Sequence, residues 1–548
     1  KQHARQIAEV TRRRVMPPWK PLPGKGEFID ARALTEAQIA VVERWVENGA
    51  PEGDPKDLPP APVFASGWQF GVPDLVVTMP APYVLRADGP DVFRTMVLPI
   101  PTDRVRYVKA IEFHPGNARA VHHANIGVDR TRASRRLDEQ DPEPGHDGSM
   151  AQAASYPPGY MLGWTPGQRP RPSPEGMAWR LERDSDLVAG LHLQTTGKPE
   201  PVQISVGFYF TDDAPVRAPV GLRLGSQTID IPPGDKAHAI TDSYKLPVDA
   251  DVIALQPHAH NLGRTMEAHA TLPDRSMVPL IEIGDWDFRW QDVYRFARPV
   301  HLPRGSVIAM KYVYDNSAAN VRNPFHPPQR IAWGQNTNDE MGDLWVQLVP
   351  RDDRQFTALS GDVAAKMRAE DLKAYSGLLR QEPNKAFRHE AVALLYLQGG
   401  DADKAVAHFR DAIRLDSSVA ATHYNLGLAL TGQRKLDEAI GAFRKAVQLD
   451  PQHADAENNL GALLQATAHF DEAVPHYRRA LELKPENAEA HDNLARHRSR
   501  CEHAVPALDA RPRKQAVHRG HLRKACQRFG AAHQQRTNPT RLDHGQHA

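Results

Sequence analysis

The chain has 548 residues, which is long enough for several domains. Its 68 basic and 67 acidic residues leave a formal net charge of +1, which argues against nucleic-acid binding by the chain as a whole. No run of 18 apolar residues occurs, so no membrane-spanning helix is expected, and the two cysteines are too few for a disulfide framework.

The first 60 residues join a Pro-rich stretch, VMPPWKPLPGKGEF, to an amphipathic segment. Thr35 and Gln38 have the spacing of a capping box and Gly49 is a helix stop, which predicts a helix between them. Residues 1–60 resemble the distal half of a c-type cytochrome domain, with Met16 where an axial haem ligand would lie. The chain has no Cys-x-x-Cys-His motif, so haem is not attachable here, and the alternative is a short helix packed on the next domain.

The next region, from about residue 65 to residue 352, predicts an all-β structure. Short apolar runs such as DLVVTMP, PVQISVGFYF and SVIAMKYVYDN alternate with turns rich in Pro and Gly. The stretch DDAPVRAP, from Asp213 to Pro219, interrupts two strand-like runs. We therefore predict two domains, 65–214 and 215–352.

Five histidines and one methionine in this region have the composition of metal sites. They are His122 and His123 in VHHANIGV, His192 in GLHLQTTGKPE, His258 and His260 in PHAHNLG, and Met341 in TNDEMGDLW. Imidazole binds several first-row metals, whereas a thioether is soft and selects Cu(I). A methionine combined with a His-x-His pair therefore favours copper.

The spacing within each motif bears on whether its rings can share one ion. His258 and His260 lie two apart in a predicted strand, so both rings project from the same face. His122 and His123 are neighbours and would point to opposite faces. Sharing a metal then requires a twisted or bulged strand, or the use of different ring nitrogens.

Each piece taken alone has an ordinary explanation. A His-His pair is commonly incidental in a chain with 26 histidines, His192 could be a half-buried ring, and Met341 could fill a gap in the core. The conjunction of the His-His pair, His192, the His-x-His pair and Met341 favours a copper protein. Four other histidines have no paired partner in sequence. His114 is predicted to be a surface residue or a neighbour of the ligands. The other three are predicted to be structural or solvated: His269, His301 and His326.

The order of these residues, and neighbours such as HNLG and DEM, resemble the copper type II, ascorbate-dependent monooxygenases, the family of peptidylglycine alpha-hydroxylating monooxygenase and dopamine beta-monooxygenase. The resemblance implies two tandem jelly-roll sandwiches with one copper each. It assigns the electron-donating copper to His122, His123 and His192. It assigns the copper at which oxygen meets the substrate to His258, His260 and Met341, which would be the catalytic set.

The same resemblance implies hydroxylation of a C–H bond of a small organic substrate by O2, with an external reductant such as ascorbate and a solvent-filled gap between the coppers. Gln256 replaces an Arg that binds the peptide carboxylate in the amidating enzyme, and Trp345 replaces a Tyr, so peptide amidation is not expected. Animal members carry disulfides in these sandwiches, whereas Cys501 and Cys526 lie outside this region.

Two other functions stay open from the sequence. One is a non-catalytic copper-binding or electron-relay protein whose C-terminal part binds proteins. The other is a zinc hydrolase built on His258 and His260, which lacks the carboxylate base expected beside such a pair. Intact ligands at both predicted sites favour the monooxygenase.

Beyond residue 352 the pattern becomes helical, with a linker at 353–386 and then tetratricopeptide repeats at 387–500. Equivalent residues recur with the ~34-residue period of this repeat. The recurring pairs are Gly427 and Gly461, Ala439 and Ala473, Phe443 and Tyr477, and Pro451 and Pro485. Three repeats to about residue 486 and a partial fourth predict an α-solenoid. Such arrays commonly bind a protein or peptide, and the alternative is a structural appendage.

The final stretch, 501–548, is rich in Arg, His and Gln and is predicted to be a disordered basic tail. Nucleic-acid binding is not expected of it, because only Phe529 places an aromatic ring among its basic residues. Since the chain begins with Lys1, we expect an upstream piece with the haem motif and an export signal. The cytochrome-like segment and the copper ligands together predict a periplasmic or secreted protein.

Overall fold

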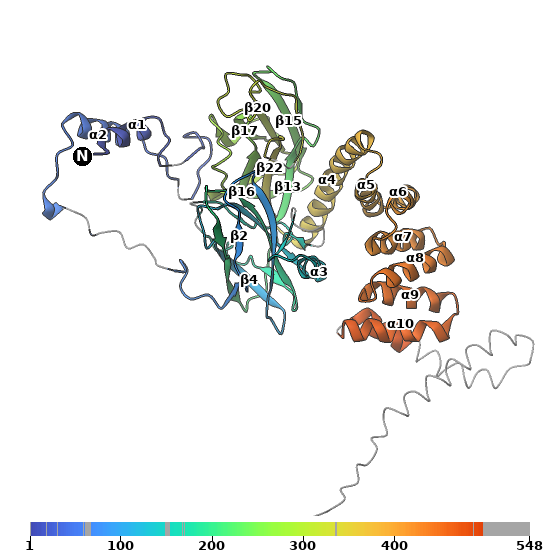
Figure 1. Cartoon of the computed structure of the whole chain (residues 1–548). Coiled ribbons are helices and arrows are strands. Elements are labelled where there is room, and N and C mark those ends of the chain that lie inside the picture. The colour runs from blue at the N-terminus through green and yellow to red at the C-terminus, as the bar shows by residue number, and fades with distance from the viewer. Residues whose placement is uncertain are drawn as a thin grey trace, which may run out of the picture. The chain divides into compact units, whose positions relative to one another are not determined.

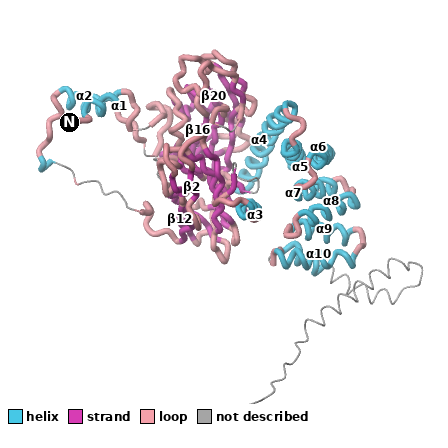
Figure 2. Tube along the Cα trace, viewed as in Figure 1, coloured by secondary structure: helices cyan, strands magenta, loops and turns pink. Residues whose placement is uncertain are grey.

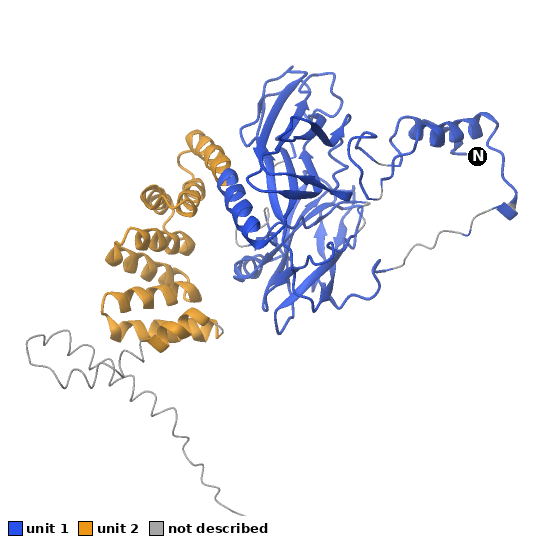
Figure 3. Ribbon diagram, turned by 180° about the vertical axis from the view of Figure 1, so that it is seen from behind, with its two compact units in different colours: residues 1–367 blue, residues 368–548 orange. Residues whose placement is uncertain are grey.

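The computed structural model describes residues 2–496, apart from residues 18, 30, 58–59, 61–66, 148–153, 167, 169, 335–336 and 486. Two compact units divide the chain, Lys1–Met367 and Arg368–Ala548 (Figure 3). The predicted disordered tail, 501–548, lies outside the described residues.

Antiparallel strands dominate the first unit (Figure 2). In its first half, one sheet has the order β1 (Leu75–Thr78), β12 (Ser205–Thr211), β4 (Arg106–His114) and β9 (Trp179–Leu181). The other has the order β6 (His146–Asp147), β3 (Val92–Pro99), β10 (Asp186–Leu193), β5 (Val121–Asp129) and β7 (Ala154–Ser155), with β8 (Gly163–Trp164) also paired to β5. The pair β2 (Tyr83–Leu85) and β11 (Glu200–Val202) and helix α3 (Ala133–Gln140) complete this half. Buried residues of both sheets, such as Val108 and Ile126, share one apolar core.

The second half of this unit also contains two main antiparallel sheets, and these enclose a core of their own. One sheet has the order β13 (Val220–Gly225), β22 (Gly342–Pro350), β16 (Ala250–Ala259) and β19 (Tyr294–Leu302). The other has the order β15 (His238–Lys245), β20 (Val307–Tyr314), β17 (Gly263–Thr271) and β18 (Met277–Ile283), and β14 (Asp230–Ile231) pairs with β21 (Ile331–Ala332). Leu255 and Tyr312 lie in its core. The predicted junction falls in the connection between β12 and β13.

The N-terminal segment contains α1 (Ala4–Arg12), α2 (Glu36–Glu47) and a 3-10 turn, η1 (Pro55–Asp57). The predicted helix is confirmed, because the Thr35 side chain accepts from the backbone N–H of Gln38 and the Gln38 side chain accepts in return from Thr35. Gly49 follows with φ of +79°, a conformation suited to glycine at a helix end. Met16 has half of its surface exposed.

Helix α4 (Asp353–Gln381) begins in the first unit. Leu359 and Val363 join the core of the second half. The Tyr244 hydroxyl donates to the Asp362 carboxylate over 3.0 Å, which fixes the start of the helix to β15. None of the helices in the described part of the chain has the length and apolar character needed to cross a bilayer.

In the described part of the second unit, three helix pairs follow the end of α4 (Figure 1). They are α5 (Ala386–Gln398) with α6 (Ala402–Leu415), α7 (Ala420–Gly432) with α8 (Leu436–Leu449), and α9 (Ala454–Ala466) with α10 (Phe470–Leu483). The recurring aromatic residues pack on the recurring glycines, since a Cβ on Gly427 would lie 2.7 Å from the Phe443 ring. The predicted repeat solenoid is therefore confirmed in its helices, and the structure adds a packing rule, the contact of an aromatic ring with a glycine.

This packing rule gives a stability prediction. We expect Gly427→Ala to lower the thermal midpoint of helix unfolding, because the new methyl group collides with Phe443 and overpacking typically costs about 1–3 kcal/mol. Gly441 lies in α8 with no atom within 4 Å of an added Cβ, so Gly441→Ala should instead raise the midpoint through better helix propensity. Circular dichroism at increasing temperature measures both, and equal shifts of the two variants would contradict the packing rule.

Candidate metal centre

Three of the predicted ligands meet between neighbouring strands of the first half. His192 on β10 lies opposite His123 on β5, and the next pair is Leu193 with Val121. His122 is therefore the extra residue of a β-bulge. The bulge removes the strict alternation of side chains, and one ligand atom from each of His122, His123 and His192 lies within 4.8 Å of the others. This cluster is called the triad below.

A carboxylate orients one ring of the triad. His192 Nε2 lies 2.6 Å from Asp91 Oδ2, so Nε2 carries the proton and Nδ1 keeps its lone pair. That Nδ1 lies 3.2 Å from Nδ1 of His122. Two nitrogens bound at tetrahedral angles to one ion lie roughly 3.3–3.4 Å apart, so the spacing fits a shared metal. His122 Nε2 is buried and has no hydrogen-bond partner among the described residues.

The surroundings of His122 and His123 keep these two rings neutral. Burial, together with the neighbouring His192 ring, lowers the pKa of His122 to about 4. Burial likewise holds the pKa of His123 well below its ordinary value. The hydrogen bond from His192 lowers the pKa of Asp91, which keeps this carboxylate ionised. Neutral imidazole is the form that binds a metal, so His122 and His123 are ready to bind without first losing protons.

The second pair of histidines lies at the end of β16. The rings of His258 and His260 have centroids 5.2 Å apart. The Nδ1 of His258 bonds to the side-chain oxygen of Gln291, and Nδ1 of His260 bonds over 3.0 Å to the carbonyl oxygen of Asp339. Because both acceptors are carbonyl oxygens, each ring carries its proton on Nδ1 and presents the Nε2 lone pair to a metal.

Met341 lies next to this pair through strand register. Gly342 on β22 pairs with Ala259, the residue between the two histidines. The Tyr314 hydroxyl donates to the Met341 carbonyl over 3.0 Å, and an added Cβ on Gly342 would lie only 2.2 Å from that hydroxyl. Glycine after the methionine is therefore required for this close approach. His258, His260 and Met341 are called the His-Met cluster below.

Glu340 organises the backbone of the His-Met cluster. Its carboxyl group, fully buried, accepts from the backbone N–H groups of His260, Leu262 and Met341. Burial raises the pKa of Glu340 to about 8, although the three donors act in the opposite direction. Through these hydrogen bonds the carboxyl group holds the two chain segments that carry the ligands in one arrangement.

Packing against Trp286 explains the glycine of the HNLG motif. Trp286 is buried, and its indole N–H donates to the carbonyl oxygens of Ala259 and His260. A Cβ on Gly263 would lie 2.7 Å from the Trp286 ring. The glycine therefore lets the indole reach the backbone that carries the histidines.

An aromatic ring lies between the two groups of ligands. Phe288 is buried, and its centroid is 5.5 Å from that of His122 and 5.2 Å from that of His260. Gln291, three residues later, bonds to His258 and donates to the Phe288 carbonyl. One loop between β18 and β19 thus places an apolar ring close to one histidine of each group.

Sequence reasoning did not assign the residues that support the ligands. Asp91, Phe288 and Gln291 stand in no recognisable motif, since each contacts its histidine across a long stretch of chain. Glu340 directly precedes Met341 in the DEM motif, and this position beside a predicted ligand was the sequence feature that could have indicated its role. Gln256 and Trp345 replace the Arg and Tyr of the amidating enzyme in the resemblance described above. The two residues pair in register between β16 and β22.

The unpaired histidines have other partners. His114 bonds to Glu112 over 3.0 Å and stacks on Trp68. His301 bonds to Asp251 over 2.8 Å at an exposed position. His269 lies 3.8 Å from an exposed Glu267 carboxylate. These three side chains therefore belong to local pairs in the described structure.

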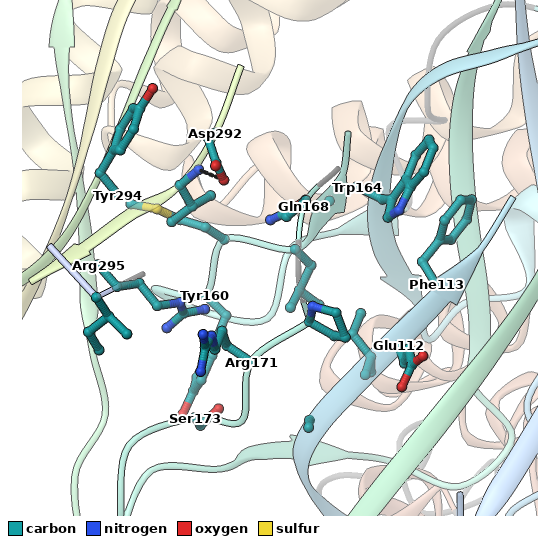
Figure 4. Close-up of a pocket in the computed structure, with 18 of the residues that line it drawn as sticks. Glu112, Phe113, Tyr160, Trp164, Gln168, Arg171, Ser173, Asp292, Tyr294 and Arg295 are labelled. Carbon is teal, nitrogen blue, oxygen red and sulfur yellow. Dashed lines mark hydrogen bonds between the residues drawn. The ribbon is translucent and has the colours of Figure 1, made fainter. Parts of the chain in front are cut away.

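A cavity of about 410 Å³ lies apart from the predicted ligands and is lined by both halves of the first unit (Figure 4). Tyr160 and Tyr294 line it, and their hydroxyl groups are buried without a hydrogen-bond partner among the described residues. Burial raises the pKa of Tyr160 to about 12. The cavity also contains Arg171 and Arg295, and burial together with Arg171 lowers the pKa of Arg295. Its polar groups are suited to hydrogen bonding with a small molecule.

Two family models match the second unit. Both are tetratricopeptide repeat models, one over residues 391–454 and the other over residues 430–496. This part of the chain therefore consists of tetratricopeptide repeats, as its period and helices indicate. No curated protein matches the chain.

Several solved structures resemble parts of the chain. The crystal structure of MamA is 18% identical, with 32% of this chain and 95% of that chain covered and a TM-score of 0.24. The Arabidopsis OM64 TPR domain is 23% identical, with 20% and 92% covered and a TM-score of 0.20. The first TPR of Spaghetti (RPAP3), bound to the HSP90 peptide SRMEEVD, is 27% identical, with 20% and 89% covered and a TM-score of 0.20.

Proposed function

We propose that this protein, whose C-terminal part consists of tetratricopeptide repeats, is a copper-dependent monooxygenase that hydroxylates a C–H bond of a small organic substrate with O2 and an external reductant such as ascorbate. The observation that carries the proposal is the triad, in which three imidazole rings converge and Asp91 orients His192. The His-Met cluster, in contact with the same Phe288 ring, supports it.

The two groups of ligands differ in a way that suits two tasks. When bound, copper would supply the one-electron chemistry and the activation of oxygen that C–H hydroxylation needs. The triad offers imidazole nitrogens alone and lies in a buried setting, which suits an electron donor. The His-Met cluster adds the soft thioether of Met341, which favours the reduced ion. Gln291 and Asp339 orient its two rings and are positioning groups.

The same proposal also assigns roles to the domains and a location to the protein. We assign the two β-sheet halves of the first unit to tandem jelly rolls, one for each copper, and residues 1–60 to a cytochrome-like segment. The tetratricopeptide repeats would bind a protein or peptide partner. Copper and cytochrome-like parts together favour a periplasmic or secreted location.

The competing function is copper binding or electron relay without turnover. It uses the same ligands, and it differs in predicting no dependence of oxygen consumption on the His-Met cluster. The proposed function is therefore tested by substituting the ligand that an electron relay does not need.

We expect wild type to bind two coppers and to consume oxygen with ascorbate, and Met341→Ala to lose at least about tenfold of that rate, because the thioether that favours reduced copper is removed. Met277→Ala is the matched control, since this methionine lies in the same half with 62% of its surface exposed. Copper analysis and an oxygen electrode measure both quantities. Oxygen consumption that is equal in the two variants would favour the relay instead.

A further inference from the structure

A second group of potential metal ligands lies in the first tetratricopeptide repeat, far from the copper ligands in sequence. His389 is on α5, and His408 and Asp411 are on α6. One ligand atom from each lies within 4.8 Å of the others, and His389 is buried. We propose that these three residues bind a divalent transition metal of the zinc type and thereby join the two helices of the first repeat.

The tautomer of His389 suits metal binding. Its Nε2 lies 2.9 Å from the carbonyl oxygen of Pro383, so Nε2 carries the proton and Nδ1 keeps its lone pair. This hydrogen bond is the backbone form of the outer partner that metal-binding histidines commonly have. The ring is therefore fixed with its lone pair directed toward α6.

The distances fit one small ion. Nδ1 of His389 lies 3.3 Å from Nδ1 of His408, close to the roughly 3.3–3.4 Å expected for two nitrogens at tetrahedral angles on one zinc. The Asp411 carboxylate lies 3.9 Å from Nδ1 of His389, within reach after a small side-chain rotation. Tyr396 stacks on the His408 ring with an angle of 9° between the planes, which holds that ring in place.

The neighbouring repeats carry other side chains at the equivalent positions. His423 is the next equivalent of His389 and donates in the same way to the carbonyl oxygen of Ser417, but Ala442 replaces the second histidine. One repeat further, Glu457 and His476 occupy the two positions, and Nδ1 of His476 bonds directly to the Glu457 carboxylate. In the described repeats, two facing histidines with an aspartate occur in the first, so the donor set is specific to it rather than a general feature of the fold.

Charge around the group is compatible with a cation. Burial and the nearby His389 ring lower the pKa of His408, whereas Asp411 raises it. Asp411 also pairs with Arg414 over 3.1 Å at an exposed position. An ion bound by two neutral rings and one carboxylate would leave positions for water, as in zinc sites with three protein ligands.

The test is zinc binding by the full chain, measured as zinc bound per chain after gel filtration and as the shift of the helix unfolding midpoint with zinc. We expect His408→Ala to bind one zinc fewer than wild type and to lose the zinc-dependent shift of the midpoint. His476→Ala is the matched control, because it removes the equivalent histidine two repeats later. It should bind as much zinc as wild type.

Equal zinc content in wild type and His408→Ala would overturn the site and leave a simple His-His hydrogen bond. Loss of the same zinc in His476→Ala would overturn it as well. Asp411→Asn keeps the side-chain volume and should weaken zinc binding with little change in the fold, which separates loss of a ligand from misfolding. The difference between variants does not depend on copper, so failure of the proposed monooxygenase leaves this test intact.

Discussion

The His192→Ala protein is expected to retain one copper per chain and to lose ascorbate-dependent oxygen consumption by at least about 100-fold. Loss of an outer partner of a metal ligand commonly costs 10- to 100-fold in affinity or activity, and His192 is itself a proposed ligand. Its ring lies close to both of the others, with centroids 4.9 Å from His122 and 5.0 Å from His123. Removing it leaves the triad without its oriented member.

The control for this variant is His301→Ala. His301 also bonds to a carboxylate, Asp251, but it lies at an exposed position on β19. Its substitution should leave copper content and oxygen consumption unchanged. Copper analysis and an oxygen electrode decide between the outcomes, and a His192→Ala protein that keeps both coppers would exclude the triad as a copper site.

A more conservative variant separates an effect on metal binding from an effect on the stability of the fold. Asp91→Asn keeps the size of the side chain and removes the charge that holds His192 in one tautomer. Copper affinity at the triad should fall about 10- to 100-fold, while the thermal midpoint changes little, because Asp91 is only half-buried. A titration of the apoprotein with Cu(I) in the presence of a competing chelator measures the affinity.

Glu340→Ala is expected to destabilise the first unit by about 3 kcal/mol or more. The carboxylate is the acceptor for the backbone N–H groups of His260, Leu262 and Met341, and each buried donor left without a partner costs about 1–3 kcal/mol. The same change frees the segments that carry the His-Met cluster, so the copper proposed to bind there should be lost as well.

Tryptophan fluorescence during heating measures this effect, because Trp286 is buried beside the same backbone. Glu267→Ala is the control, since this glutamate lies on β17 with an exposed side chain. Glu340→Gln should fall between the two, because its amide keeps one acceptor oxygen. If Glu340→Ala unfolds at the same temperature as Glu267→Ala, the three hydrogen bonds do not stabilise the unit.

Local patterns predicted much of the fold. Thr35 and Gln38 form the expected capping box, because capping depends on residues three apart. The alternating apolar runs became antiparallel strands, and the period of the C-terminal part became three helix pairs. Both follow from spacing along the chain, which sets the face that each side chain occupies. The pairing order of the strands could not be read in this way.

Residue type and period are properties of short stretches of chain, so the amino-acid sequence alone shows which side chains are available as ligands and that the C-terminal part is a tetratricopeptide solenoid. How these side chains meet depends on the tertiary structure. The bulge at His122, the carboxylate of Asp91 behind His192 and the Phe288 ring between the two groups all arise from segments distant in sequence. Strand pairing and packing bring them together, and neither leaves a local pattern that spacing could reveal.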